Sequence, residues 1–254
     1  MTITIDKICR YPVKGLTAEL LTATTLTPGQ GLVSDRRFAL TLGTTPVDGP
    51  TMAWMPKTAF LCLMLHAKLA KLTTRFDAET GILTVDRGGK SVTKGDITTP
   101  VGRAMIEEFF AAFMGPDARG RPKLVECEPG AILSDIADGV CSIINLASVR
   151  DLERVTGSEI DPIRFRANIY LDGLEPWTEF DWVGKDLNLG TATLNVIKRI
   201  DRCAATHVNP STGERDLKLL NDLKRGFGHV DMGIYATVTT AGEIATGDEL
   251  RVSE

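Results

Sequence analysis

The sequence predicts a mostly β protein with some α-helix, in which strands dominate and a few helices cover the sheets. Short runs rich in β-branched residues recur between glycine and proline turns, which is typical of barrels and sandwiches. The 254 residues also exceed the usual size of one core, so one large or two modest domains are expected. The polar turn Arg119–Pro122 is the expected boundary and divides the chain into residues 1–118 and 119–254.

Strands dominate the first half. Three runs read as strands because β-branched and apolar residues gather in them: Thr2–Ile5, Leu20–Leu26 and Arg37–Leu42. Gly81–Lys90 is expected to form a hairpin with a Gly-Gly tip. Ala53–Leu72 fits either one face of a helix or a buried strand, and the pattern does not decide between them.

Two helices are expected. Val101–Met114 mixes apolar and acidic residues and is stopped by Gly115 and Pro116. Ser148 is the expected N-cap of a second helix, with Asp151 at the capping-box position.

Further strands complete the predicted sheets. The run Ser142–Leu146 is the strand that leads into the second helix. From Ile169 onward short strands recur, and Glu249–Val252 is expected to complete the sheet.

Composition narrows the class of protein. A net charge of −4 argues against a nucleic-acid binder, and no segment approaches the ~20 apolar residues of a membrane span. The N-terminus lacks the pattern of a secretory signal. Five scattered cysteines fit reduced thiols in a cytoplasm, which is the expected location, and exclude a cysteine-clustered iron–sulfur site: Cys9, Cys62, Cys127, Cys141 and Cys203.

Cys203 is the residue most suited to chemistry. It follows an apolar strand-like run, lies between basic residues and precedes a turn. A thiolate is both a nucleophile and a soft metal ligand, and positive neighbours such as Arg199 and Arg202 favour it. The alternative is a small buried residue at a strand end.

A zinc site at Cys203 is not favoured. His207 lies four residues away, but a structural zinc needs two further ligands. Only His66 and His229 remain as histidines, and their spacing shows no pairing.

Basic residues near turns suggest an anion site. Lys14 stands in a glycine-bearing turn, and Arg36 follows Asp35. Arg164 and Arg166 alternate around a phenylalanine, so on a strand both would point to one face. Two such arginines are costly unless paired or bound to an anion, although a solvated strand edge is the alternative.

Several of these segments resemble one protein family. Tyr11–Gly15 and Gly31–Arg37 resemble the β-barrel domain that precedes the MOSC domain in many proteins. Three further segments resemble the MOSC domain itself, which is named for the C-terminal part of molybdenum cofactor sulfurases: Arg164–Ile169, Arg199–Gly213 and Gly242–Asp248. The resemblance covers roughly residues 3–60 and 130–252 and is to bacterial relatives of the molybdenum amidoxime-reducing component.

The resemblance implies an N-terminal β-barrel-like domain followed by a MOSC β-barrel domain with flanking helices. It also implies a Mo-molybdopterin cofactor. Cys203 aligns with the cysteine that ligates molybdenum, and a single thiolate suffices there because the pterin dithiolene supplies further sulfurs. Cys203 is therefore both the implied metal ligand and the implied catalytic residue. The implied cofactor-binding residues are Lys14, Gly15, Arg36, Asn145, Ser148, Arg166, Asn168, Arg202 and Tyr235.

Some positions depart from the family pattern. Gly15 stands where relatives often have serine, and Ala167 replaces the proline of an Arg-Pro-Asn run. His207 replaces a threonine near the metal, where its pKa could tune protonation. We expect no appended ferredoxin-like domain, and a separate electron-donor protein is therefore the expected partner.

The leading interpretation is a molybdenum-cofactor oxidoreductase that reduces N-hydroxylated substrates such as hydroxylamines or amidoximes. The first alternative is a cofactor carrier or sulfur-transfer protein with a persulfide on Cys203. A third is a β-barrel binding module without catalysis. Bound molybdenum with redox turnover favours the first, and tight cofactor binding without turnover favours the second.

Overall fold

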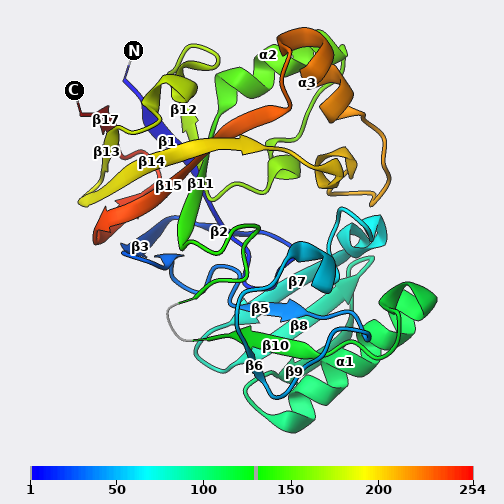
Figure 1. Ribbon diagram of the computed structural model, residues 1–254. Coiled ribbons are helices and arrows are strands. Elements are labelled where there is room, and N and C mark those ends of the chain that lie inside the picture. Colours follow the sequence, from blue (N-terminus) through cyan, green and yellow to red (C-terminus); the bar gives the residue numbers. More distant parts are fainter. Residues whose placement is uncertain (1, 129–130, 254) are drawn as a thin grey trace.

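A computed structural model describes residues 2–128 and 131–253, and confirms a mostly β protein with flanking helices (Figure 1). Its largest sheet has eight strands in the order β17-β13-β14-β15-β11-β12-β1-β2. Their bounds are β1 Thr4–Arg10, β2 Glu19–Leu21, β11 Val140–Asn145, β12 Ile169–Asp172, β13 Asp186–Leu189, β14 Ala192–Asp201, β15 Asp231–Thr240 and β17 Leu250–Val252. The expected C-terminal strand is thus β17, and it lies at the end of this order.

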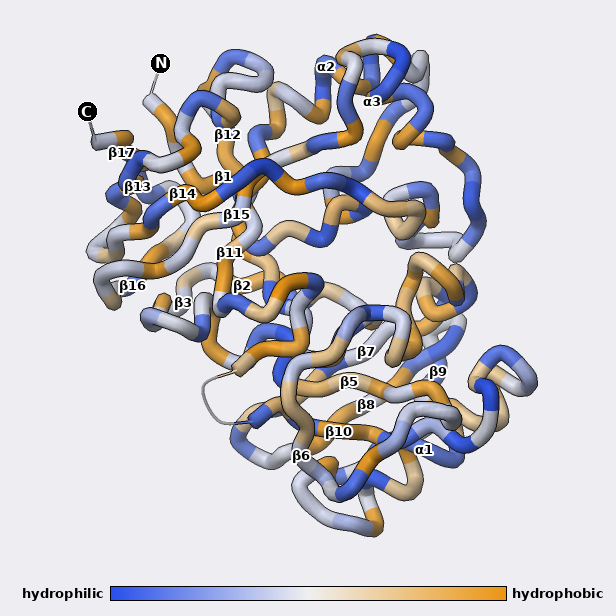
Figure 2. Tube along the Cα trace, in the orientation of Figure 1, coloured by the Kyte–Doolittle hydropathy of each residue, from blue (hydrophilic) through white to orange (hydrophobic). Residues whose placement is uncertain are grey.

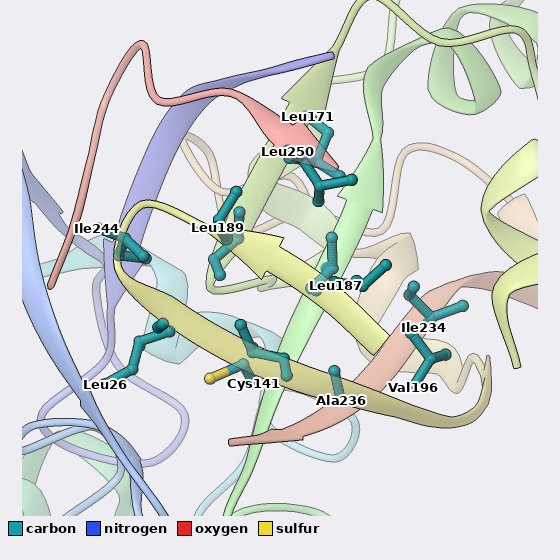
Figure 3. Packing of buried hydrophobic residues seen from close by; sticks show 14 of the residues in the cluster. Leu26, Cys141, Leu171, Leu187, Leu189, Val196, Ile234, Ala236, Ile244 and Leu250 are labelled. Carbon is teal, nitrogen blue, oxygen red and sulfur yellow. The ribbon is translucent and has the colours of Figure 1, made fainter. Parts of the chain in front are cut away.

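A three-stranded sheet covers one side of the large sheet. It consists of β3 (Ala23–Thr27), β4 (Gly31–Leu32) and β16 (Gly242–Ala245). Leu26 and Ile244 from this sheet share a buried apolar cluster with Val196 of β14, as Figure 3 shows. The strands therefore curl around a common core, which is the barrel interior of the C-terminal half.

The lower half of Figure 1 is a second β unit. Its strands form two sheets of three: β5 Phe38–Leu40, β6 Thr51–Met52 and β10 Leu124–Cys127 in one, and β7 Leu72–Asp77, β8 Ile82–Arg87 and β9 Lys90–Asp96 in the other. Helix α1 (Pro100–Met114) packs on this unit, and Ile106 and Phe110 are fully buried in its core. Figure 2 shows β5 and β10 as apolar segments inside the unit.

Local sequence explains the hairpin and the first helix. Gly88 and Gly89 both have positive φ, as a two-residue hairpin turn between β8 and β9 requires. Thr99 caps α1 by accepting a hydrogen bond from the Gly102 amide at 3.1 Å, and Pro100 opens the first turn. Both predicted elements are confirmed.

The undecided stretch Ala53–Leu72 forms neither a long helix nor a strand. It contains two short 3-10 helices, η1 (Lys57–Ala59) and η2 (Ala67–Lys71), joined by irregular backbone. Leu61 and Leu69 are buried, so apolar residues of this stretch pack into the core although they lie in short turns and not in a long helix or strand.

The second helix begins earlier than predicted. Helix α2 spans Leu146–Thr156 and is capped by Asn145, whose side chain accepts from the Ala147 amide. The prediction that Ser148 is the N-cap is therefore wrong. Helices α2 and α3 (Leu219–Phe227) pack on the outer face of the large sheet through a separate apolar cluster that includes Leu152 and Leu223.

The predicted Arg164–Arg166 strand is also wrong. Pro162–Phe165 forms the 3-10 helix η4, and Arg166 ends it with a left-handed φ of 51°. Strand β12 begins only at Ile169, so the two arginines do not alternate along a strand.

Strand pairing crosses the predicted domain boundary in both directions. Strand β1 pairs with β12 of the large sheet, whereas β10 pairs with β5 and β6 of the smaller unit. The division into residues 1–118 and 119–254 therefore stays a prediction. None of the helices in the described part of the chain has the length and apolar character that crossing a bilayer requires.

Candidate functional site

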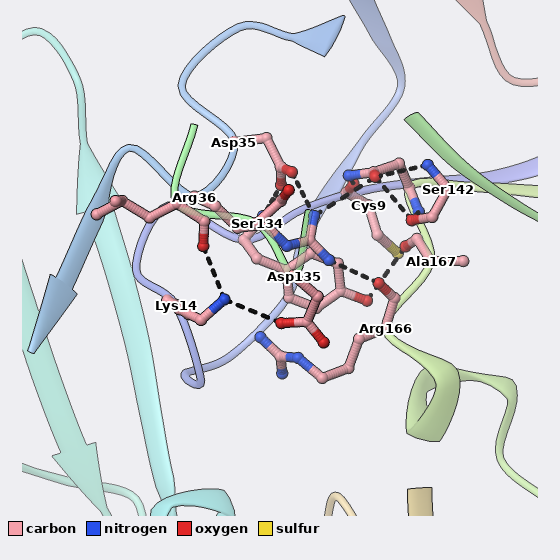
Figure 4. Close-up of polar contacts among 12 residues, drawn as sticks. Cys9, Lys14, Asp35, Arg36, Ser134, Asp135, Ser142, Arg166 and Ala167 are labelled. Atoms are coloured by element: carbon pink, nitrogen blue, oxygen red, sulfur yellow. Dashed lines mark hydrogen bonds and ion pairs between the residues drawn. The ribbon is translucent and has the colours of Figure 1, made fainter. Parts of the chain in front are cut away.

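A cavity of about 280 Å³ lies where the two β units meet. The smaller unit and the segments leading into it contribute Lys14 and Lys57, and the large sheet with its turns contributes Arg166, Cys203 and Tyr235. This cavity is called the Cys203 cavity below. Figure 4 shows part of its wall.

Cys203 lies directly after β14 and before the 3-10 helix η6 (Ala204–His207), as the sequence predicted. Its side chain is half-buried and lines the cavity. The preceding Arg202 holds this turn in place, because its guanidinium donates to the carbonyls of Phe165 (2.8 Å) and Met232 (2.8 Å). Arg202 therefore fixes the position of Cys203 while it lines the cavity.

Lys14, Lys57 and Asp135 form an ion-pair network in the wall. The Lys14 ammonium donates to the Leu133 carbonyl at 2.8 Å and to the Asp135 carboxylate at 2.9 Å. The Lys57 ammonium donates to the other oxygen of Asp135 at 3.0 Å. Residues more than 75 positions apart are joined in this way, since Asp135 follows Lys57 by 78 residues.

Burial and charge shift the pKa values of this network. Burial lowers the pKa of Lys14, which is only 6% exposed, although Asp135 opposes the shift. Burial raises the pKa of Asp135, whereas the two lysines lower it. Because the effect of the lysines is larger, the pKa of Asp135 lies far below its usual range. Burial also disfavours the Lys57 cation, but Asp135 and Cys203 outweigh it and raise the pKa of Lys57.

Two arginines stack over one buried tyrosine. The guanidinium carbons of Arg36 and Arg166 lie 4.7 Å and 4.2 Å from the centre of the Tyr11 ring. Arg36 is held by Asp35 and by the Arg166 carbonyl, at 2.8 Å from the latter. Because its guanidinium already donates to Asp35 and to the Arg166 carbonyl, Arg36 stabilises the cavity wall.

Arg166 differs from Arg36. Its guanidinium has no hydrogen-bond acceptor within residues 2–128 and 131–253, and in Figure 4 it extends toward Asp135 without a contact. Burial lowers the pKa of Arg166. A half-buried guanidinium with free donors in a cavity is a binding group for an anion.

Asn168 and Tyr235 complete the predicted set in the cavity. The Asn168 amide is engaged within the protein, because its oxygen accepts from the Ser142 hydroxyl at 2.8 Å and its nitrogen donates to the Cys9 carbonyl at 3.2 Å. Tyr235, on β15, lines the cavity, and burial raises the pKa of its phenol. Tyr235 therefore keeps its proton at neutral pH.

Gly15 is required at its position. It has a φ of 81°, and an added Cβ would lie 2.8 Å from the Leu61 carbonyl oxygen. A serine there would be strained by the backbone and by this contact. The glycine that departs from the family pattern is thus explained by a close approach of two chain segments.

Asn145 and Ser148 do not reach the cavity. The Asn145 amide and the Ser148 hydroxyl both donate to the fully buried carboxylate of Glu179, at 2.9 Å and 2.8 Å. Neither residue is part of the cavity wall. The expectation that they contact the cofactor is corrected, because Glu179 uses their polar groups in the packing of α2.

His207 does not line the cavity either. Its Nε2 accepts a hydrogen bond from the Leu220 amide at 3.4 Å, and burial lowers its pKa. A role of His207 in tuning protonation near the metal therefore stays a prediction.

The family comparison covers both halves of the molecule. The model of the MOSC domain matches residues 134–251, and the model of the MOSC N-terminal beta barrel domain matches residues 2–123. The chain is a MOSC-domain protein.

Curated relatives are named for the molybdenum cofactor. A molybdenum cofactor sulfurase of Caenorhabditis briggsae is 26% identical over 250 residues, which cover 91% of this chain and 33% of that protein. One of Caenorhabditis elegans is 35% identical over 158 residues, which cover 61% of this chain and 22% of that protein. The chain thus spans a third or less of the length of these relatives.

One solved structure aligns along nearly the whole chain. The YUAD protein from Bacillus subtilis covers 99% of this MOSC-domain chain and 96% of its own, at 14% identity and a TM-score of 0.49.

Sequence reasoning missed Lys57 and Asp135. Lys57 lies in the stretch whose secondary structure the pattern left undecided, and Asp135 lies in an irregular segment before β11. No local spacing marks either residue. The two residues form an ion pair only because the fold brings the two β units of this MOSC-domain chain together.

The cavity fits a cofactor that brings its own metal ligands. Six cationic side chains and two carboxylates line it, and Asp135 is already paired with two of the lysines. The described residues contain no group of three His, Cys, Asp or Glu side chains that could hold a metal by themselves. One accessible thiol beside the unpaired guanidinium of Arg166 therefore suits an anionic cofactor that supplies sulfur to its metal.

Proposed function

We propose that the Cys203 cavity binds Mo-molybdopterin and that the protein reduces N-hydroxylated compounds to amines. The observation that carries the proposal is one half-buried thiol in a cavity with a six-to-two excess of cationic over anionic side chains. Similarity to molybdenum cofactor sulfurases supports the cofactor, although these relatives are much longer.

Three groups would hold the cofactor. The Cys203 thiolate would ligate the metal, and the unpaired guanidinium of Arg166 would bind the terminal phosphate together with Lys14. Gly15 lines the same cavity, where its lack of a side chain permits the close approach of the Leu61 backbone. When bound, the cofactor supplies the two-electron chemistry that removes the oxygen of an N–O bond.

The reaction balances as R–NHOH plus two electrons and two protons giving R–NH2 plus water. The N–O bond breaks, one N–H bond forms on the product and one O–H bond forms on the released water, so the substrate is reduced. A separate electron-donor protein would supply the electrons. Tyr235 remains protonated because burial raises its pKa, so its hydroxyl can donate a hydrogen bond inside the cavity.

The second candidate is a cofactor carrier or sulfur-transfer protein. The relatives that match this chain are named sulfurases, and that observation favours it. In this case Cys203 would carry a persulfide, with the outer sulfur delivered to an acceptor.

Molybdenum content tests the proposal. The wild-type protein, Cys203→Ala and Cys127→Ala are produced in a molybdate-fed host with an intact cofactor pathway and measured by elemental analysis. Cys127 is the matched control because it is also half-buried but lies outside the Cys203 cavity. We expect near-stoichiometric metal in the wild type and in Cys127→Ala, with loss of the metal or of its thiolate spectrum in Cys203→Ala.

Turnover then separates the two candidates. Reduction of benzamidoxime with a chemical electron donor supports the oxidoreductase. Absence of molybdenum from wild-type protein rejects it. Intact-mass detection of one extra sulfur on the wild type but not on Cys203→Ala would instead establish the sulfur-transfer protein.

A further inference from the structure

A second cavity adjoins the Cys203 cavity. Its volume is about 540 Å³, and the two cavities share wall residues, among them Gly15, Arg166 and Ala205. Ala205 lies two residues after Cys203. The two cavities therefore adjoin at residues that are close in sequence to the thiol.

Apolar side chains form much of the second cavity. Leu69 and Leu72 are almost fully buried beneath it, and Leu63 is a wall that both cavities share. At the surface, Leu20 on β2 is 68% exposed and lines the same cavity. A large exposed leucine at the opening of a leucine-lined cavity favours an apolar ligand body.

The charges of this wall all have one sign. Lys7, Lys71, Arg164 and Arg166 line the cavity, and none of its described lining residues is Asp or Glu. Lys7 and Lys71 form no ion pair within the described part of the chain, whereas Arg164 is paired with Asp216 at 2.8 Å. In a protein of net charge −4, this local excess of free cations selects for an anion.

We propose that the second cavity is the substrate site and that it binds an apolar molecule carrying a carboxylate. The apolar body rests on the leucines, the carboxylate pairs with Lys7 and Lys71, and the N-hydroxy end reaches the Cys203 cavity. The inference rests on the proposed function, because it names the substrate class of the same site. The lysines contribute through charge and the leucines through burial, so the two contributions are separable.

A matched ligand pair tests the charge. The probes are 4′-carboxybiphenyl-4-amidoxime and its neutral 4′-carbamoyl counterpart, which share size and reacting group. Binding to the full-length protein is measured by titration calorimetry, and reduction by steady-state kinetics. We expect the carboxylate to bind about tenfold more tightly, a preference that appears in KM and leaves kcat unchanged.

Variants assign the preference to the cavity. The double variant Lys7→Gln/Lys71→Gln should remove the preference for the carboxylate and leave the affinity for the carbamoyl probe unchanged. Leu20→Gln should weaken both probes equally. Lys94→Gln/Lys185→Gln is the control, because both lysines are exposed and lie outside the cavity.

The outcomes distinguish this inference from the proposed function. If neither probe is reduced but the lysine-dependent preference appears in calorimetry, the reductase proposal fails and the carboxylate site stands. If both are reduced with equal KM, the carboxylate site is overturned. Binding of cytidine or guanosine monophosphate that depends on the same lysines, without binding of the carboxylate probe, would also overturn it and assign the cavity to a nucleotide.

Discussion

Arg166 combines several features that cost free energy in the folded protein. It adopts a left-handed φ of 51°, lies on the Tyr11 ring beside a second guanidinium, and has no acceptor in the described structure. A left-handed conformation costs a non-glycine residue of order 1 kcal/mol. Such features persist at sites where a ligand is bound, which agrees with a role in holding an anion.

Removal of the Arg166 charge tests this reading. We expect Arg166→Gln to change the free energy of unfolding of the cofactor-free protein by less than about 1 kcal/mol, because only its contact with the Tyr11 ring is lost. The same change at Arg202 should cost about 2 kcal/mol, since it leaves the Phe165 and Met232 carbonyls unpaired. Urea denaturation measures both. Equal losses would give Arg166 a structural role and contradict the prediction.

At the scale of elements, the start of α2 depends on a buried carboxylate. Glu179, in the 3-10 helix η5 (Thr178–Trp182), accepts from Asn145 and Ser148. Burial raises its pKa, and the hydrogen bonds from these two residues oppose the shift only in part. Because the folded pKa lies above the unfolded one, the stability contribution is full at low pH and is lost as pH rises through the folded pKa.

Glu179→Gln should therefore stabilise the protein in alkaline conditions. The glutamine oxygen still accepts from Asn145, and no charge has to be buried. We expect a higher melting temperature than wild type at pH 8 and a smaller difference at pH 4. The control Glu159→Gln, at an exposed position, should stay within about 0.5 kcal/mol of wild type at both values. A pH-independent difference would show that ionisation of Glu179 is not the cause.

At the scale of the whole molecule, Asp135 joins the two β units. It pairs with Lys14 and Lys57, and the lysines hold its pKa far below the usual range against the effect of burial. Such a carboxylate stabilises the fold above about pH 4, the ordinary Asp value, and loses that contribution as the pH falls below it. The same carboxylate occupies two cations that face the Cys203 cavity.

Asp135→Asn should separate stability from anion binding. The variant loses about 1 kcal/mol of unfolding free energy at pH 7, because the Asp135 side chain is 42% exposed and its ion pairs are partly screened. It should also bind inorganic phosphate more tightly than wild type, since two ammonium groups become free. The increase of melting temperature with phosphate measures this. An increase no larger than in wild type would show that Lys14 and Lys57 are not anion donors.

The sequence alone determined the local elements and the central residue. Gly88 and Gly89 fix a hairpin, Gly115 ends α1, and Cys203 follows a strand, because each depends on neighbours along the chain. It also identified the family and predicted ten site residues. In the structure eight of them line the Cys203 cavity: Lys14, Gly15, Arg36, Arg166, Asn168, Arg202, Cys203 and Tyr235.

The tertiary structure decided how those residues are used. Asn145 and Ser148 serve Glu179, Asn168 is engaged by Ser142 and Cys9, and Arg166 alone keeps free donors, which no local pattern shows. Lys57 and Asp135 became visible only when the two β units were brought together. The reason is physical: a polar side chain is available to a ligand only if the fold leaves it without a partner, and partners are chosen by distance in space.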